Sequence, residues 1–471
     1  RRDFGGIGKD KGELPQNIEL LPQVLGKAGY RTYALGKWHL APDWEDGSQG
    51  NNASWPLQRG FDRYYGFISG WTNQFHPDLV EDNHALSKPD RTGYHLSEDL
   101  VDHAIANLDA SAGKPSFLYL AFGAGHAPHQ VPKAFVDRYK TRYAEGWDKV
   151  RMARIARLKR MGMIPGDTAL PPINPGDRPW NTLTKTERTV YARFMAVYAG
   201  FIEHTDTQIG RLVTHLKKTG QYDNTMFVLI SDNGAAGEGG QKGAFLSPYK
   251  EGDLTPDQML ERLDDLGTER SGPEYQRPWA MAGVTPLRRY KVWPYAGGVR
   301  TPLIISWPRG IAARGAIRTQ LIDTIDLAPT IADVAGGQFA KTVSGKAAIP
   351  VAGRSVRATF ATAGAPTRSV QFFELRGNRA ITSGDWRAVA MHKDGTPFSQ
   401  DKWELFDVAH DYSESTDLSA RYPAKLKELQ AIWLRQATRY STPALSEAPE
   451  WYRMRNRYQD AFIEAGPKTG K

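Results

Sequence analysis

The sequence predicts an α/β protein with a large mixed, mostly parallel sheet flanked by helices, followed by a smaller antiparallel sheet that carries one helix. Two observations lead to this fold class. In residues 1–336, segments with helical spacing of apolar residues alternate with short apolar runs, which is typical of β–α units around a parallel sheet. From about residue 337 the chain becomes polar and strand-like, which is typical of an antiparallel sheet with one solvent-facing side.

Size and composition are those of a globular protein with a large core. The chain has 471 residues, 40% of them hydrophobic, and no cysteine, which excludes disulfides and thiolate metal sites. The longest apolar runs have strand length, far below the roughly 18 residues of a membrane span, so we expect no membrane partner. We divide the chain into a large α/β domain over 1–336, a small α+β subdomain over 337–442 and a tail over 443–471.

The first two β–α units are predicted from periodicity and helix-stop signals. Asn17–Ala28 has helical spacing and ends at Gly29, and Arg31–Leu35 follows as a short strand. A second helix over Glu98–Leu108 precedes a strand over Ser116–Phe122. The same reasoning predicts further elements in this order: one or two long helices in Thr184–Lys218, a buried strand Thr225–Ile230, a charged helix in Asp253–Gly267, a strand Thr301–Trp307 and a helix Ile325–Gly336.

The C-terminal part contains three strand-like pieces and one amphipathic helix. The strands are predicted over Val370–Leu375, Trp386–Met391 and Trp403–Phe406, and the helix over Pro423–Thr438. Because the strands are short and separated by turn residues, we expect an antiparallel sheet with the helix packed on one face.

The net charge of +9 favours anionic partners. The densest basic stretch, Lys149–Arg160, has helical spacing and is predicted to be a solvated helix face. It is accompanied by no zinc-finger, helix-turn-helix or RNP pattern. We therefore expect no nucleic-acid partner.

Chemistry-bearing residues follow predicted strands at three places. Lys37 and His39 come just after the first strand, His126 just after the second, and Asp232 at the end of the third. Reactive groups of open α/β sheets gather beyond the carboxyl ends of strands. An ammonium beside an imidazole suits a centre that handles an anionic, oxygen-rich group. Asp232-Asn233 offers oxygen ligands for a hard cation, although Asp-Asn-Gly is also strong turn chemistry.

Two further candidates need more context. Lys291 lies shortly before Gly297-Gly298, where the glycines permit close backbone approach. His129 lies three residues after His126, beyond Ala127-Pro128. We interpret His129 as a residue at the rim of the site or in support of it.

Four segments together, Arg31–Leu40, Phe122–Pro132, Val228–Gly234 and Lys291–Pro302, resemble the sulfatase family of the alkaline-phosphatase superfamily in the layout of bacterial arylsulfatases. The resemblance extends from about Leu14 to about Thr442. It implies hydrolysis of a sulfate monoester, with a small molecule or a glycan as the partner.

The resemblance also implies a role for each matching residue. Lys37 would bridge the nucleophile and a sulfate oxygen, and His39 would remove a proton when the covalent intermediate breaks down. His126 would contact sulfate, and Lys291 would contact sulfate and the leaving-group oxygen. Asp232 and Asn233 would be ligands of a bound Ca²⁺.

One departure from the family pattern stands out. The family nucleophile is formylglycine, made from a Cys or Ser in a C/S-x-P-x-R motif, and an Asp-Asp pair supplies two more metal ligands. We expect no residue of this chain to supply either element, and place both upstream of residue 1 in an N-terminally incomplete sulfatase. Because Ca²⁺ usually takes six to eight oxygen ligands, we expect weak metal binding and no turnover by the chain as given.

Two other functions stay open. A phosphonate monoester or phosphodiester hydrolase of the same superfamily could use the same scaffold, and a catalytically dead sulfatase-like protein could bind without turnover. The oligomeric state is left open. The compartment is expected to be the cytoplasm or periplasm of a bacterium.

Overall fold

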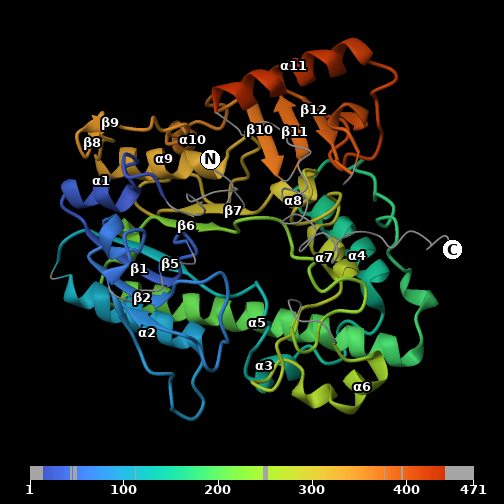
Figure 1. Ribbon diagram of the computed structural model, residues 1–471, viewed down its shortest axis with the longest axis horizontal. Coiled ribbons are helices and arrows are strands. Elements are labelled where there is room, and N and C mark those ends of the chain that lie inside the picture. Colours follow the sequence, from blue (N-terminus) through green and yellow to red (C-terminus); the bar gives the residue numbers. More distant parts are fainter. Residues whose placement is uncertain are drawn as a thin grey trace.

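The computed structural model describes residues 14–42, 45, 50–111, 113–247, 253–375, 377–393 and 396–440. These residues form a mixed sheet flanked by helices and a separate C-terminal antiparallel sheet of four strands (Figure 1). The predicted fold class is therefore confirmed. Of the helices in this part of the chain, none combines the length and the apolarity that crossing a membrane requires. The predicted tail over 443–471 lies outside the described residues.

The main sheet has five strands in the order β4-β3-β2-β1-β5. Its parallel core consists of β1 (Arg31–Lys37), β2 (Arg63–Phe67) and β5 (Ser116–Ala121). A short antiparallel edge adds β3 (Val80–Glu81) and β4 (His84–Ala85). Gly36 near the end of β1 pairs with Ala121 at the end of β5. The segments that follow these two strands therefore leave the sheet side by side. A Cβ on Gly36 would lie 1.9 Å from the Ala121 carbonyl oxygen, so this close approach requires glycine.

Helices cover the sheet on the side shown at the lower part of Figure 1. The longest, α5 (Lys185–Lys218), is one unbroken helix of 34 residues. Its start is fixed by a capping box in which the Thr184 hydroxyl accepts from the Glu187 amide and the Glu187 carboxylate accepts from the Thr184 amide. Leu212 and Leu216 of α5 share one apolar cluster with residues of α2 (Leu96–Ala110) and with Leu35 and Phe67 of the sheet.

The remaining elements are shorter. The α-helices are α1 (Leu21–Lys27), α3 (Lys133–Asp137), α4 (Gly146–Arg160), α6 (Pro256–Glu261), α7 (Arg277–Val284), α8 (Ala296–Val299), α9 (Leu327–Ala335) and α10 (Ala358–Ala361). Short 3₁₀ turns are η2 (Leu57–Arg59), η3 (Trp180–Thr182), η4 (Tyr222–Asn224), η5 (Leu263–Asp265), η6 (Thr324–Asp326) and η7 (Phe398–Gln400). A small hairpin is formed by β8 (Thr342–Val343) and β9 (Lys346–Ala347).

The third predicted strand differs from expectation. The strand itself, β6 (Phe227–Ile230), is present, but it pairs antiparallel with β7 (Leu303–Ser306) in a separate two-stranded sheet. It is not buried, because Leu229 is 45% and Ile230 42% exposed. Within the described residues no further strand pairs with the outer edges of β6, β7 or β5. In a continuous parallel sheet both faces of such a strand would be covered. Here the apolar side chains of Leu229 and Ile230 remain accessible to solvent.

These open edges predict self-association. Unpaired apolar strand edges template pairing with other chains, so we expect concentration-dependent association in sedimentation velocity. Replacing Ile304, which is 54% exposed on β7, with Lys should lower the associated fraction several-fold. The matched control is Leu434→Lys, since Leu434 is 62% exposed on the C-terminal helix. An equal reduction in both variants, or a monomer at every concentration, would contradict this prediction.

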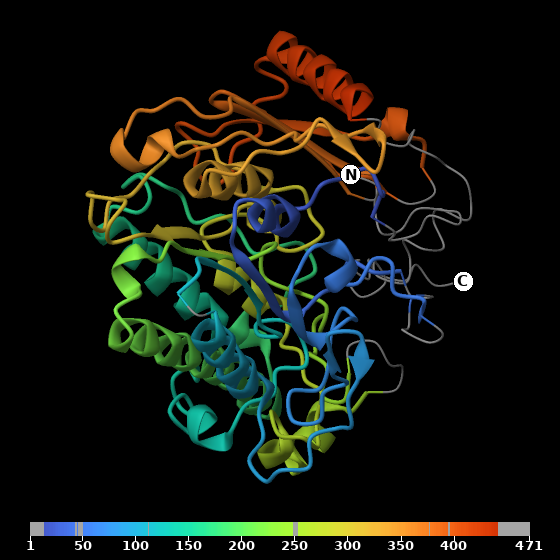
Figure 2. The ribbon, with the colours of Figure 1, turned by 90° about the vertical axis from the view of Figure 1, so that its left-hand side faces the viewer.

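The C-terminal sheet has the order β10-β11-β12-β13 and is antiparallel throughout. Its strands and helix are β10 (Val370–Leu375), β11 (Asn378–Ser383), β12 (Trp386–Ala390), β13 (Trp403–Asp407) and α11 (Pro423–Arg439). Leu429 and Trp433 of α11 pack on one face of the sheet against Ile381, Ala388 and Leu405. Figure 2 shows α11 on the outer face of this sheet, with α9 and α1 on its inner side.

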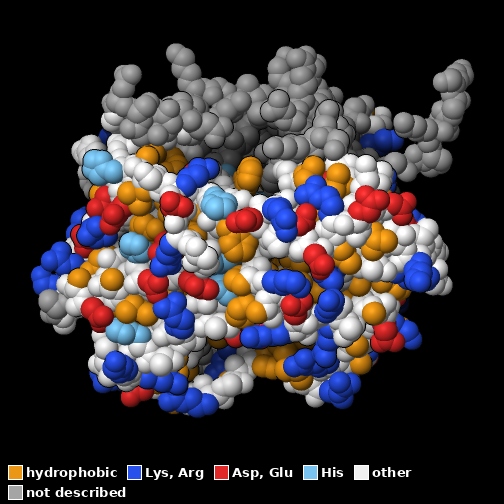
Figure 3. Space-filling model, turned by 90° about the horizontal axis from the view of Figure 1, so that it is seen from below, with side chains coloured by type: hydrophobic (Ala, Val, Ile, Leu, Met, Phe, Trp, Pro, Cys, Tyr) orange, Lys and Arg blue, Asp and Glu red, His pale blue; other side chains and the backbone are white. Residues whose placement is uncertain are grey.

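The basic helix α4 is only partly the solvated face that was predicted. Arg157 is exposed, but Arg151 is buried and donates to the Pro171 carbonyl oxygen. Arg154 is exposed and donates to the Thr285 carbonyl oxygen, 3.2 Å away. On the face of the molecule in Figure 3, basic and acidic side chains are interspersed, so the positive net charge forms no continuous basic surface there.

Candidate active site

Lys37 is the last residue of β1 and lies at the carboxyl end of the parallel core. Burial lowers the pKa of its ammonium, and the nearby positive charge of Lys291 lowers it further, whereas the carboxylates of Asp232 and Glu238 raise it. Two chain segments that are distant from Lys37 in sequence, residues 232–238 and the segment of Lys291, therefore lie within electrostatic range of this one side chain.

His39 lies two residues further along the chain, just after β1. Its backbone adopts a positive φ of 50°, its side chain is exposed, and its amide donates to the Ile68 carbonyl oxygen at 2.9 Å. The ring lies directly over Gly70, where a Cβ would come within 2.7 Å of the His39 Cε1. His39 therefore sits beside the segment that follows β2, while Lys37 faces the segments of Asp232, Glu238 and Lys291.

His126 enters the site from the loop that follows β5. Its Nδ1 lies 2.9 Å from the Ala127 carbonyl oxygen. Because a carbonyl only accepts, Nδ1 carries the proton in the neutral ring and Nε2 keeps a lone pair. Nε2 faces the Lys291 ammonium at 3.4 Å. Burial, followed by the Lys291 charge, lowers the pKa of His126, which favours the neutral ring that accepts from Lys291.

The Lys291 segment is locked to the segment that carries Asp232. The Lys291 amide donates to the Ala235 carbonyl oxygen at 3.0 Å, and the Gly234 amide donates to the Gly298 carbonyl oxygen at 3.0 Å. A Cβ on Gly234 would lie 1.8 Å from the Gly297 carbonyl oxygen. The glycines of the predicted Gly297-Gly298 signal thus allow two backbones to touch and fix the position of Lys291.

The side chain that holds Lys291 was not predicted from the sequence. Lys291 Nζ forms an ion pair of 2.7 Å with Glu238 Oε1, and Glu238 Oε2 lies 3.9 Å from His126 Nε2. Glu238 is only 8% exposed. The available signal was a lone carboxylate in the glycine-rich stretch Gly237-Glu-Gly-Gly240, which the sequence alone indicates only as a loop.

Asp232 and Asn233 follow the end of β6 and supply oxygen atoms at the same place. Asp232 is exposed, and Asn233 donates its amide hydrogen to the Gly234 carbonyl oxygen at 3.1 Å, leaving its own side-chain oxygen available. No group of three or more His, Cys, Asp or Glu that could hold a metal occurs among the described residues. These two oxygens fit part of a Ca²⁺ shell but fall short of the usual six to eight ligands.

One serine does match the C/S-x-P-x-R pattern, contrary to our expectation that no residue would: Ser87, followed by Lys88, Pro89, Asp90 and Arg91. Its side chain is exposed, just beyond β4. Ala85 of β4 is separated from Gly36 of β1 by β3 and β2, which is about 14 Å at ~4.8 Å per strand spacing. The match therefore does not place a nucleophile beside Lys37.

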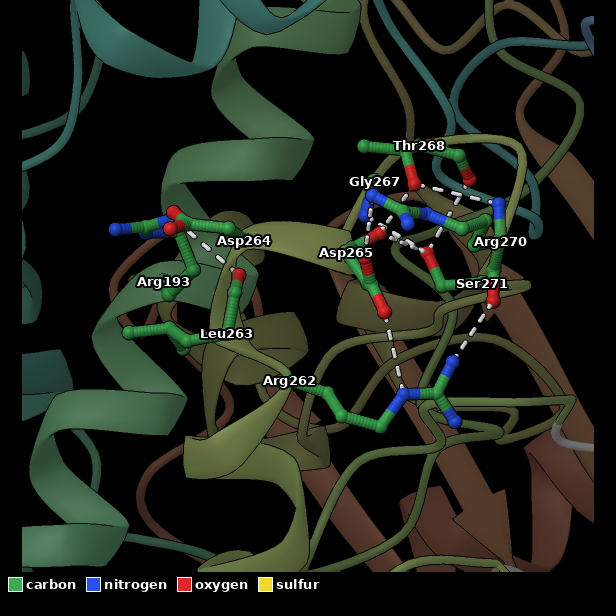
Figure 4. Close-up of polar contacts among 9 residues, drawn as sticks. All are labelled: Arg193, Arg262, Leu263, Asp264, Asp265, Gly267, Thr268, Arg270 and Ser271. Carbon is green, nitrogen blue, oxygen red and sulfur yellow. Dashed lines mark hydrogen bonds and ion pairs between the residues drawn. The ribbon is translucent and has the colours of Figure 1, made fainter.

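The loop that carries His126 is hydrogen-bonded through Gln130 to two other segments, those of Gln74 and Ser271. Gln130 receives a hydrogen bond from the Gln74 amide at 2.9 Å, and its own side-chain amide donates to the Ser271 carbonyl oxygen at 2.7 Å. Ser271 belongs to the turn over 262–271 drawn in Figure 4. There the Ser271 hydroxyl accepts from the Gly267 amide at 2.9 Å and donates to the Asp265 carbonyl oxygen at 2.8 Å. This internal bonding stiffens the surface on which the loop rests.

His129 is not at the rim of the site, as one of our interpretations had it. It is fully buried among the rings of Tyr198, Phe201 and Tyr275, at centroid distances of 5.1, 6.3 and 5.0 Å. Its amide donates to the Pro273 carbonyl oxygen at 2.8 Å. Burial, and then the proximity of His126, lowers the pKa of His129 to about 3. Its role is to anchor the loop in the core.

This burial predicts a loss of stability in acid. The folded protein protonates His129 only near pH 3, but the unfolded chain protonates it near its ordinary value of about 6.5. Between these values the unfolded state binds more protons, so the free energy of unfolding falls as the pH falls, by up to about 1.4 kcal/mol per pH unit. His129→Phe should reduce this slope in urea denaturation between about pH 7 and about pH 4. The control His410→Gln replaces a side chain that is 85% exposed; an unchanged slope in His129→Phe contradicts the prediction.

The C-terminal subdomain also fixes the Lys291 segment. Glu414 forms an ion pair of 2.8 Å with Arg387 of β12, and its other carboxylate oxygen accepts from the Ala296 amide at 2.8 Å. Arg387 also donates to the Pro294 carbonyl oxygen. Both charged side chains are buried, 7% exposed for Arg387 and 0% for Glu414. The turn between Lys291 and Gly297 is thus tied to a rigid sheet.

The site therefore brings together Lys37, His126, Lys291 and Asp232 with its neighbour Asn233, and adds Glu238. Two ammonium groups next to one neutral imidazole suit the binding of a tetrahedral oxyanion. Lys291 carries hydrogens that it can donate to an oxygen of such a ligand. Nothing in these contacts assigns a role to His39 beyond its place next to the site.

Comparison with known proteins agrees with this arrangement. A family model described as Sulfatase matches residues 2–337, and one described as N-sulphoglucosamine sulphohydrolase, C-terminal, matches residues 290–434. An uncharacterized sulfatase of Schizosaccharomyces pombe is 32% identical over 453 residues, covering 92% of this chain and 78% of that protein. An arylsulfatase of Klebsiella aerogenes is 33% identical over 371 residues, 75% of each chain.

The fold has solved counterparts as well. One, a protein in complex with its substrate D-glucosamine-2-N,6-O-disulfate, has a TM-score of 0.57 and 20% identity, covering 93% of this chain and 86% of that one. At this identity the likeness concerns the fold alone. The family model, however, matches well over half of the chain, and the relative from Schizosaccharomyces pombe is more than 30% identical over most of its length. The chain belongs to the sulfatase family.

Proposed function

We propose that this site serves the hydrolysis of sulfate monoesters to an alcohol or phenol and inorganic sulfate. The observation that carries the proposal is the convergence of Lys37, His126 and Lys291 beyond the carboxyl ends of β1 and β5, next to Asp232. Family membership supports it. The Klebsiella aerogenes relative is named an arylsulfatase, and a protein of the same fold was solved with a sulfated sugar as substrate, so aryl and sugar sulfates are the substrate classes to test.

In this proposal the two lysines have different tasks. Lys37, desolvated at the end of β1, binds a sulfate oxygen as a fixed positive charge. Lys291 donates a proton or a hydrogen bond to the leaving oxygen as its bond to sulfur breaks. Neutral His126 accepts from Lys291 through Nε2 at 3.4 Å and so aims the ammonium. The proton donor is therefore assigned to Lys291 and its orientation to His126.

We propose further that Asp232 and Asn233 are ligands of a divalent cation, with Ca²⁺ as the ion expected for the family. When bound, the cation would supply positive charge next to the sulfate oxygens. Because these two residues complete only part of a shell, we expect weak Ca²⁺ binding by the 471 residues alone. The chain has no cysteine and its matching serine is remote, so we derive no step through formylglycine and expect no turnover by this polypeptide alone.

The test of the function uses the protein encoded by the whole gene, including any coding sequence that precedes Arg1. Co-expression with a formylglycine-generating enzyme should give hydrolysis of p-nitrophenyl sulfate when a C-x-P-S-R-like motif is present. Lys291→Met should then lower kcat about 10²-fold or more. A protein with that motif that hydrolyses phosphonate or phosphate diesters but no sulfate ester supports the alternative hydrolase. A protein that binds sulfate esters but hydrolyses none supports the binding protein. Turnover by residues 1–471 alone contradicts the expectation of inactivity.

A further inference from the structure

Glu238 is a buried negative charge at the place where an anionic ligand would bind. Its side chain is 7% exposed, and one carboxylate oxygen pairs with Lys291 at 2.7 Å. The other oxygen, Oε2, has no hydrogen-bond partner within the described part of the chain and lies 3.9 Å from His126 Nε2. Glu238 also acts on Lys37 electrostatically. Lys37, His126 and Lys291, which would contact the oxyanion, thus all lie near Glu238.

The backbone on both sides of Glu238 is tightly packed, so the point from which its side chain extends is fixed next to the site. A Cβ on Gly237 would come within 2.7 Å of the Tyr290 ring, and a Cβ on Gly239 within 2.3 Å of the Tyr275 carbonyl oxygen. The Gly240 carbonyl oxygen accepts from the Arg277 amide at 2.8 Å. Glycines on both sides allow this tight packing and fix the backbone position of Glu238.

A second buried carboxyl group lies behind Glu238. Glu274 is 0% exposed, and burial, followed by the charge of Glu238, raises its pKa well above the usual range. Both effects favour the neutral form of Glu274, which adds no charge. Among the described side chains that act on Lys37, the charged groups are Lys291, Asp232 and Glu238, which together with Lys37 make two cations and two anions. These four charges sum to zero, so the described side chains do not favour a ligand of high negative charge.

We propose that Glu238 is a specificity-determining residue, which makes this oxyanion site favour singly charged sulfate monoesters over doubly charged phosphate-type groups. The inference rests on the proposed function, because it assumes that the ligand binds at Lys37 and Lys291. A sulfate monoester carries one negative charge at any pH near neutral, whereas phosphate-type groups approach two above their second ionisation at about pH 6. The second charge would face the carboxylate of Glu238 in partly buried surroundings, where such repulsion is strong.

The experiment uses two probes of similar shape that cannot be hydrolysed at the C–S or C–P bond, phenylmethanesulfonate and phenylmethanephosphonate. Their affinities for the full chain are measured by calorimetry at about pH 5 and about pH 9, on either side of the second phosphonate ionisation. The ratio of the two affinities cancels protein titrations that affect both probes alike, including that of His126. The wild type should prefer the sulfonate at least about tenfold more strongly at high pH than at low pH.

Glu238→Gln keeps the shape of the side chain and removes its charge, so most of this pH-dependent preference should disappear. Glu261→Gln on α6, an exposed residue, changes the net charge equally and should leave the ratio unchanged. If both probes bind but Glu238→Gln does not alter the ratio, the inference about Glu238 is wrong and the proposed function stands. If neither probe binds the wild type, the proposed site itself fails. If Glu238→Gln does not fold, the wild-type measurements alone decide. A wild-type preference for the sulfonate over the phosphonate that is the same at both pH values overturns the inference.

Discussion

Replacing Lys291 with methionine is expected to lower the free energy of unfolding by about 3 kcal/mol and the affinity for phenylmethanesulfonate by at least about tenfold. Both effects have one origin. The ammonium of Lys291 is the cation paired with Glu238 at 2.7 Å, and its removal leaves a carboxylate that is 93% buried by side-chain area without its partner. The same change removes one of the two ammonium groups that would bind the oxyanion.

A second substitution separates these two effects. In Lys291→Met/Glu238→Gln the unpaired charge is gone, so most of the lost stability should return. The affinity for the sulfonate should stay low, because the binding cation is still missing. Chemical denaturation and calorimetry on the wild type, both single variants and the double variant provide the comparison. Recovery of both quantities in the double variant would show that Lys291 acts on the ligand only through Glu238.

Replacing Glu414 with alanine is expected to cost about 3–5 kcal/mol of the free energy of unfolding, because it leaves Arg387 buried without its partner. The same carboxylate accepts from the Ala296 amide at 2.8 Å, which lies between Lys291 and the glycines that lock its segment. We therefore also expect a fall in affinity for phenylmethanesulfonate, although Glu414 does not reach the ligand site. Urea denaturation and calorimetry measure the two effects.

A surface ion pair is the control for this variant. Lys425 and Glu428 pair at 2.6 Å on α11, with side chains 33% and 53% exposed. Glu428→Ala should change the free energy of unfolding by no more than about 0.5 kcal/mol and leave the affinity unaltered. If Glu414→Ala weakens folding but not sulfonate binding, the C-terminal sheet stabilises the protein without positioning Lys291.

The sequence predicted the parallel core well, because periodicity and stop signals report local structure directly. Arg31–Leu35 and Ser116–Phe122 were placed within two residues of β1 and β5. The long helix over Thr184–Lys218 was found as well, and the structure shows that it is not divided. The strand β11 was missed since Asn378–Ser383 has only two adjacent apolar residues, Ala380 and Ile381, between polar ones, and shows neither an alternating pattern nor a continuous apolar run.

Burial and side-chain pairing were harder to predict, because they depend on contacts between distant segments. Thr225–Ile230 is apolar enough for a buried strand, yet half of the observed strand is exposed. The burial of a strand depends on which other segments pack on it, and its own sequence does not specify them. His129 looked like a neighbour of the site by its spacing from His126, and only three aromatic rings from other segments show that it belongs to the core. Glu238 carried no signal of its own, because its partner lies 53 residues further along the chain.

Lys37 and Lys291 are 254 residues apart in sequence, and the proposed function requires that both bind the same anion. A crystal structure of the protein soaked with phenylmethanesulfonate tests this directly. We predict one sulfonate group with its oxygens within hydrogen-bond distance, about 2.7–3.2 Å, of the ammonium nitrogens of both lysines, close to His126. A sulfonate bound at another surface, or held by one lysine while the other points away from it, would contradict a shared anion site at Lys37 and Lys291.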